Sequence, residues 1–156
     1  FIGDFLKSFL AVLIVSLIFG KSHADMLPLL KLYAGLGAVL GHDFPITLGF
    51  KGGKGVAAPA GMICGFNPIL LLLALGVFMA ISIPSGYISL GSLCAYIFFF
   101  FGTVTLGLLG KLHMTQPLLI ELYIVALILT LLCCLQHRNN IKRLIRGEEK
   151  KTYFFK

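Results

Sequence analysis

Residues 41–56, GHDFPITLGFKGGKGV, here called the glycine-lysine loop, carry groups suited to binding an anion. The loop places three glycines between and beside two lysines: Lys51, Gly52, Gly53, Lys54 and Gly55. Glycine lets the main chain approach a ligand closely, so successive backbone N–H groups can converge on an anion while the lysines add charge. A helix that begins directly afterwards would direct its positive dipole end at the same anion. The pattern therefore predicts a phosphate-binding loop.

Two other interpretations of the glycine-lysine loop compete with this one. A nucleotide-binding P-loop requires a glycine five residues before the Gly-Lys pair and Ser or Thr after the lysine. Leu48 and Gly55 occupy those two positions, so the spacing excludes a P-loop. A solvated loop that only sets the orientation of a membrane protein stays open as the alternative, although we favour anion binding.

A second group of reactive side chains, His137, Asn140, Arg143 and Glu149, follows the last apolar run. A histidine exchanges protons near neutral pH, an asparagine can orient a hydroxyl or a carbonyl, and an arginine can bind phosphate through two hydrogen bonds. The competing interpretation is a basic anchor at the membrane surface, with His137 merely interfacial. The residues alone favour that anchor.

Five further side chains are candidates for supporting roles: Asp4, Lys7, His42, Ser89 and Ser92. Asp4 and Lys7 are three residues apart, so they share a helix face and can form an ion pair. Alternatively, Lys7 extends to the lipid headgroups. His42 can simply hold the turn that follows it, and serines in apolar helices commonly bond to the carbonyls of their own helix.

The composition predicts an all-α, polytopic membrane protein. The 156 residues are 58% hydrophobic and 12% charged, with a mean hydropathy of +0.99. Apolar runs alternate with short polar joints, as in transmembrane helical bundles. We expect one domain, with spans and loops over residues 1–136 and a basic tail over residues 137–156. Six helical segments are expected, at residues 2–19, 28–40, 56–65, 69–83, 87–109 and 117–135.

The basic residues predict the orientation of these segments. An even number of segments places both ends of the chain on one side of the membrane. That side would hold ten of the 13 lysines and arginines, and only Lys21, Lys31 and Lys111 would lie on the other. An excess of Lys and Arg marks the cytoplasmic side, so the glycine-lysine loop, residues 85–92 and the tail should all face the cytoplasm. Orientation and anionic headgroups also explain the net charge of +7, and no nucleic-acid partner is expected.

Four stretches together resemble the bacterial membrane acyl-phosphate:glycerol-3-phosphate acyltransferases. GHDFPITLGFKGGKGVAA at residues 41–58 is similar to the second signature of that family, and HRNNIKRLIRGEEKK at residues 137–151 is similar to its C-terminal signature. SGYISLGS at residues 85–92 looks like the family's segment after the fourth or fifth helix, and residues 1–8 look like the start of its second helix. The resemblance covers almost the whole chain.

The resemblance implies a seven-helix membrane bundle, here without its first helix, in the bacterial inner membrane. The enzyme would move an acyl group from acyl phosphate to the sn-1 hydroxyl of glycerol 3-phosphate and release lysophosphatidic acid. Membrane lipids and the soluble enzyme that makes acyl phosphate would be further partners. The family needs no cofactor and no metal, and the four cysteines of this chain likewise show no metal-ligand spacing.

The resemblance also assigns roles to residues. The glycines and lysines of the loop would hold a phosphate, His137 and Asn140 would orient or activate the acceptor hydroxyl, and Glu149 would support the tail. Two positions depart from the family pattern, because Gly86 stands in place of Arg and Ala58 in place of Thr. The family's first signature is absent, so this chain alone is expected to be inactive. An anion transporter or channel subunit and a membrane scaffold protein remain the alternative functions.

Overall fold

A computed structural model describes residues 2–46, 49, 52–53 and 56–152 of the chain. Within those residues every regular element is an α-helix, as the apolar runs predict. The helices are α1 (Ile2–Phe19), α2 (Leu27–Asp43), α3 (Ala57–Phe66), α4 (Pro68–Ser85), α5 (Ile88–Leu108), α6 (Gln116–Gln136) and α7 (Arg138–Ile145). The first six match the six expected segments to within a few residues.

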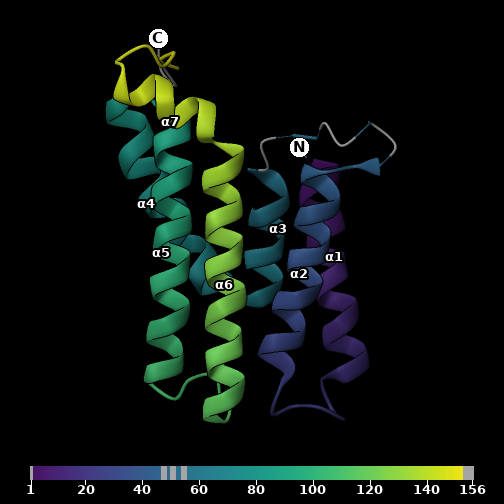
Figure 1. Ribbon diagram of the computed structural model, residues 1–156. Helices are drawn as coiled ribbons and strands as arrows, with labels where there is room; N and C mark the ends of the chain where they lie inside the picture. The colour runs from purple at the N-terminus through teal and green to yellow at the C-terminus, as the bar shows by residue number, and fades with distance from the viewer. Residues whose placement is uncertain (1, 47–48, 50–51, 54–55, 153–156) are drawn as a thin grey trace.

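The first six helices run roughly along one axis, and α7 lies across one end of the bundle (Figure 1). The start of α1 and the last described residues after α7 both lie at that end, as an even number of segments requires (Figure 1). We call it the site end. Helix α3 has 10 residues and stops short of the far end that α2, α5 and α6 reach (Figure 1). The turn between α3 and α4 therefore does not reach the far end, and it lies beside Gly102 and Thr105 of α5.

Local sequence signals explain where the helices begin and end. One of the first two positions of each of the helices α2, α4 and α6 is a proline, whose missing N–H costs no hydrogen bond there. Asn67 separates α3 from α4, and its side-chain oxygen accepts a hydrogen bond of 3.0 Å from the backbone N–H of Leu70. Helix α4 ends at Gly86, whose φ of 74° is the left-handed conformation that glycine adopts without strain.

Small residues let α1 and α3 pack with their backbones in close approach. A β-carbon at Gly61 would collide with the carbonyl oxygen of Phe5, and one at Gly65 would lie 2.8 Å from the side chain of Val12. Close backbone contact is a common way to hold helices together where lipid removes the hydrophobic driving force. The pairing fixes α1 against α3, the helix that follows the glycine-lysine loop.

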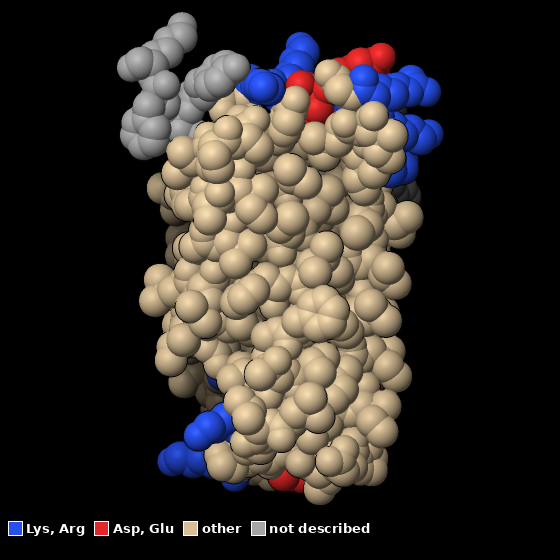
Figure 2. All heavy atoms as spheres, turned by 90° about the vertical axis from the view of Figure 1, so that its left-hand side faces the viewer, with Lys and Arg blue, Asp and Glu red and all other residues tan. Residues whose placement is uncertain are grey.

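The surface of the bundle is that of a membrane protein. Four helices, α1, α4, α5 and α6, are long and apolar enough to cross a bilayer. Lysine, arginine and acidic side chains gather toward the two ends of the molecule, and a broad belt without them lies between (Figure 2). The expected fold class, a polytopic transmembrane helical bundle, is therefore confirmed.

Three local expectations need correction. Gly41, His42 and Asp43 form the last turn of α2 rather than the beginning of a loop. The segment expected to end at residue 83 continues through Pro84 to Ser85, because a proline in the last turn still leaves the other hydrogen bonds of the helix in place. Residues 138–145 of the tail form an additional helix, α7, on the end of the bundle.

Replacing Gly61 by alanine should weaken the α1–α3 contact, since the added methyl group meets backbone that cannot rotate away. We expect the free energy of unfolding to fall by about 1–3 kcal/mol, the usual cost of overpacking. Thermal unfolding in detergent measures this. Gly76→Ala is the matched control, because a β-carbon at Gly76 of α4 meets no atom within 4 Å. Equal unfolding temperatures for the two variants would contradict the proposed contact.

Candidate active site

The carboxylate of Glu149 is the centre of a cluster at the site end. It accepts hydrogen bonds from Asn140 Nδ2 (2.6 Å) and Ser89 Oγ (2.8 Å) through Oε1, and from Arg143 Nε (2.6 Å) through Oε2. Asn140 and Arg143 come from α7, and Ser89 comes from the first turn of α5. The cluster therefore joins three separate parts of the chain. It brings together four of the residues predicted from sequence.

The Glu149 side chain is only 7% exposed, yet it stays charged at neutral pH. Burial by itself raises the pKa of this carboxyl, but the hydrogen bonds from Asn140, Arg143 and Ser89 and the charge of Arg143 outweigh burial. The net result is a Glu149 pKa below its ordinary value. The carboxylate is thus a fixed negative charge in the wall of the site.

The segment after α7 is held down on the turn between α4 and α5. The backbone N–H of Thr152 donates a hydrogen bond of 2.7 Å to the carbonyl of Gly86. The ammonium group of Lys151 lies 5.6 Å from the centre of the Tyr87 ring, within the range of a cation–π interaction. The tail therefore closes over residues 86–89.

His137 is buried at the junction of α6 and α7. Its side chain and that of Asn140 line the same cavity. The Nδ1 atom lies 2.9 Å from the carbonyl oxygen of Cys133, and a carbonyl can only accept, so Nδ1–H donates in this contact. In the neutral ring that tautomer leaves Nε2 with a lone pair, which can accept a proton.

Two cavities meet at this place. A polar cavity of about 540 Å³ at the site end is lined by His137, Asn140, Arg143 and Glu149, among others. A second cavity of about 490 Å³ lies between α3, α4 and α5 and is lined almost entirely by apolar side chains. Val56 and Ile88 line both cavities. The site can therefore accept a molecule with a polar head and a long apolar tail.

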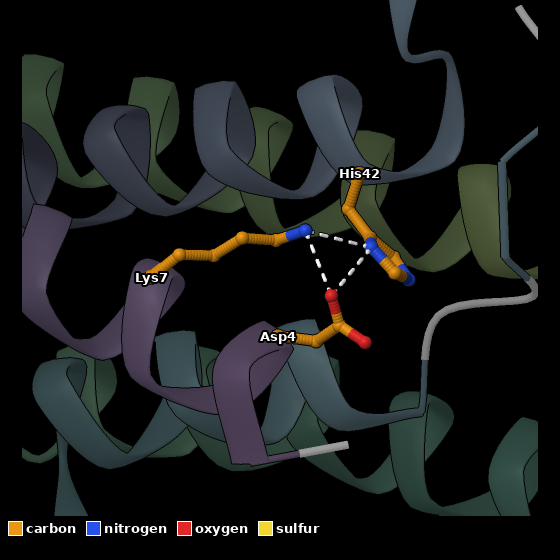
Figure 3. A network of polar contacts seen from close by, with 3 residues as sticks. All are labelled: Asp4, Lys7 and His42. Atoms are coloured by element: carbon orange, nitrogen blue, oxygen red, sulfur yellow. Dashed lines mark hydrogen bonds and ion pairs between the residues drawn. The ribbon is translucent and has the colours of Figure 1, made fainter. Parts of the chain in front are cut away.

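Asp4, Lys7 and His42 form a second polar cluster at the site end (Figure 3). Lys7 Nζ lies 2.9 Å from both Asp4 Oδ1 and His42 Nδ1, and His42 Nδ1 lies 3.3 Å from Asp4 Oδ1. The ion pair expected between Asp4 and Lys7 is confirmed. His42 connects this pair on α1 to the last turn of α2, next to the glycine-lysine loop.

Asp43 is a residue whose place the sequence did not reveal. Asp43 is only 5% exposed and its side chain lies beside Gln136 of α6, while its backbone carbonyl accepts a hydrogen bond of 3.2 Å from the N–H of Gly52. Asp43 thus links the glycine-lysine loop to the residue before His137. The sequence signal that could have identified Asp43 is the presence of a polar residue in the last turn of an otherwise apolar helix.

The remaining predicted residues take different places. Gly52 and Gly53 are described, and Gly52 packs against the end of α2 so closely that a side chain would strike the His42 and Asp43 carbonyls. Lys51, Lys54 and Gly55 lie outside the described residues. Ser92 does not join the polar cluster, since its hydroxyl bonds to the carbonyl of Ile88 and it lines the apolar cavity. Among the described residues, no three His, Cys, Asp or Glu side chains form a group that could hold a metal ion.

The fold and this site define an integral membrane protein with a polar cavity at one end of its helical bundle and an apolar cavity beside it. Residues 1–147 match the family described as glycerol-3-phosphate acyltransferase, and the chain belongs to that family.

The curated relatives and solved structures that match carry the same description. A glycerol-3-phosphate acyltransferase of Thermoanaerobacter sp. (strain X514) is 36% identical over 148 residues, which cover 95% of this chain and 66% of the relative. One from Clostridioides difficile (strain 630) is 38% identical over 159 residues, which cover 97% and 68%. A crystal structure of PlsY (YgiH), an integral membrane glycerol 3-phosphate acyltransferase, in its glycerol 3-phosphate form gives a TM-score of 0.77 at 34% identity, covering 95% of this chain and 66% of that one. The chain thus spans about two thirds of the length of such relatives.

Replacing Glu149 by glutamine should loosen the tail, because Arg143 loses its charged partner. We expect the free energy of unfolding at pH 7 to fall by about 1–3 kcal/mol. The folded-state pKa of Glu149 is lowered, so its contribution is complete above the unfolded-state pKa of about 4.3 and disappears as the pH falls through the lower, folded value. Thermal unfolding at pH 7 and in acid measures both effects.

The neighbouring acid provides the control for this prediction. Glu148 is exposed, and Glu148→Gln removes the same charge one residue away. An equal loss of stability in both variants would mean that net charge, and not the three hydrogen bonds to Glu149, stabilises the tail.

Proposed function

We propose that this chain is the membrane-embedded part of an enzyme that transfers a fatty acyl group from acyl phosphate to the sn-1 hydroxyl of glycerol 3-phosphate. The product is lysophosphatidic acid, the first intermediate of bacterial phospholipid synthesis. The observation that carries the proposal is the junction of the polar and apolar cavities at Val56 and Ile88. Membership of the acyltransferase family and the likeness to PlsY structures in glycerol 3-phosphate and lysophosphatidic acid forms support it.

The apolar cavity suits the acyl chain. Its lining runs along α5 from Ile88 to Tyr96 and along α4 from Met79 to Leu71. Eight residues of α-helix rise about 12 Å, a depth that accommodates about half of a C16 chain. The rest of the chain would extend between the helices into the bilayer. This arrangement leaves the acyl carbonyl near the cavity junction, below the polar groups.

The polar cavity suits the two phosphates and the reacting hydroxyl. In the proposed reaction the sn-1 oxygen attacks the acyl carbonyl carbon, and the bond from that carbon to the phosphate oxygen breaks. Phosphate leaves with the bonding electrons, so the protein has mainly to position the reactants and balance their charge. His137 Nε2 accepts the proton of the hydroxyl, and Asn140 orients the hydroxyl. The loop residues Lys51, Gly52, Gly53, Lys54 and Gly55 hold a phosphate, as the sequence motif predicts.

The Asp4–Lys7–His42 cluster and Arg143 supply further polar contacts around the site, and Glu149 keeps α7 in place. In this proposal the protein lies in the bacterial cell membrane with its site end in the cytoplasm, where both substrates are made. A soluble enzyme that makes acyl phosphate would deliver the donor to that face.

The activity is tested in membranes that contain the chain alone or joined to the parts of the Thermoanaerobacter relative outside the match. Labelled glycerol 3-phosphate is supplied with palmitoyl phosphate or with palmitoyl-CoA, and lysophosphatidic acid is measured. We expect product from the joined protein with palmitoyl phosphate only. Lys54→Ala should reduce the rate about 10- to 100-fold through loss of a charged hydrogen bond. His137→Ala should reduce it about 10²- to 10⁴-fold through loss of proton transfer.

His23→Ala and His113→Ala are the matched controls, because both histidines lie in the loops at the far end. They should leave the rate unchanged. A folded joined protein that forms no product from either donor would refute the transferase and favour an anion transporter. If the joined protein kept full activity when Lys51, Lys54 and His137 were each replaced by alanine, the result would favour a membrane scaffold protein.

The apolar cavity predicts a chain-length effect. Ala95 of α5 lines the cavity, and Ala95→Leu should shorten the space available to the acyl chain. We expect the rate with palmitoyl phosphate to fall about tenfold relative to the rate with octanoyl phosphate, in keeping with the cost of misfitting methylene groups in an apolar pocket. Ala80→Leu on the exposed surface of α4 is the control and should leave the ratio of the two rates unchanged.

A further inference from the structure

Helix α7 has two faces with different surroundings. Asn140 and Arg143 face the bundle and bind Glu149. At about 100° of rotation per residue, Arg138, Lys142, Ile145 and Arg146 fall on the opposite side, within an arc of about 100°. All four are exposed, and Ile145 has 82% of its surface accessible. We call these four residues the outer face of α7.

The cations of the outer face are not neutralised within the part of the chain that the structure describes. Arg138 donates to a neutral acceptor, the carbonyl oxygen of Leu135, at 3.1 Å. The side chains of Lys142 and Arg146 make no hydrogen bond or ion pair with any described residue. Two acids follow α7: Glu149 is already bound by Asn140, Arg143 and Ser89, and Glu148 forms no ion pair with any described residue. Three cations therefore remain available to an anionic partner.

The position of α7 identifies the kind of partner. The helix begins directly after α6, which is long and apolar enough to cross a bilayer, and lies across the end of the bundle (Figure 1). A helix in this position is expected at the level of the lipid headgroups. Basic side chains project past the profile of the bundle at this end (Figure 2). A helix with cations and an exposed aliphatic side chain on one face is suited to the headgroup boundary, where the cations meet anionic lipid and the aliphatic group is buried.

We propose that the outer face of α7 is a binding site for the headgroups of anionic phospholipids. Arg138, Lys142 and Arg146 contact the phosphates, and Ile145 inserts between the acyl chains. An acidic soluble protein would satisfy the cations too, but it would not account for an isoleucine exposed beside them. The site lies on the face of α7 opposite Asn140, so bound lipid holds in place the helix that carries part of the candidate active site. The proposal concerns lipid binding and does not depend on the transfer reaction.

The test compares lipid retention by the purified chain in native mass spectrometry, with phosphatidylglycerol and phosphatidylcholine present in equal amounts. The chain should retain phosphatidylglycerol preferentially. Each cation near an anionic surface contributes a factor of about five, so the Lys142→Gln/Arg146→Gln variant should bind phosphatidylglycerol about 25-fold more weakly. The preference of the unsubstituted chain should also decline as salt is raised.

Lys21→Gln/Lys111→Gln provides the matched control, because it removes the same charge from exposed positions in the far-end loops. This variant should keep the preference. Retention of phosphatidylglycerol by the α7 variant at the level of the unsubstituted chain would refute the proposal, as would equal losses in both variants. An Ile145→Ser variant separates the two contributions, since it should weaken retention of phosphatidylglycerol without changing its salt dependence. A loss of salt dependence in that variant would contradict the assigned roles.

Discussion

The hydrocarbon core of a bilayer offers no water to an unpaired polar group, and this constraint shapes the whole molecule. Backbone groups are satisfied inside helices, and the buried hydroxyl of Thr103 bonds to the carbonyl of Phe99 in its own helix. On the face that Figure 2 shows, charged side chains lie toward the two ends. Chemistry that needs charge must therefore take place at an end of the bundle. The helices enclose an apolar cavity directly beneath that end.

The site end is assembled from both halves of the chain. Helices α1 and α2 contribute Asp4, Lys7 and His42, and helices α5 and α7 contribute the residues around Glu149. Asp43 connects the two halves, because one residue contacts both the glycine-lysine loop and Gln136. The side chain of Glu149 binds Ser89 of α5 as well as Asn140 and Arg143 of α7, and so holds these two helices together. Glu149 thus fixes the orientation of Arg143 on α7.

Much of the fold was predictable because apolar runs and prolines mark membrane helices directly. The apolar runs placed six helices, and the spacing of Asp4 and Lys7 predicted their ion pair. Contacts between distant residues could not be predicted in this way. Nothing in the local pattern pairs Tyr33 with Glu121, whose hydrogen bond joins residues 88 positions apart, and nothing places Asp43 beside Gln136. The motifs identified His137, Asn140 and Glu149 as a group, but only the packing of α7 on α5 shows that Ser89 binds Glu149 and that Ser92 does not.

The short helix α3 has a consequence for how the protein enters the membrane. Its turn into α4 consists of Asn67 and Pro68, carries no charge, and stops short of the far end of the bundle. The one polar side chain there is already bonded to the N–H of Leu70. During biogenesis the α3–α4 hairpin can therefore enter from the site end as a single unit, without translocating a charged loop. The segment before it, which carries Lys51 and Lys54, then need not cross the bilayer either.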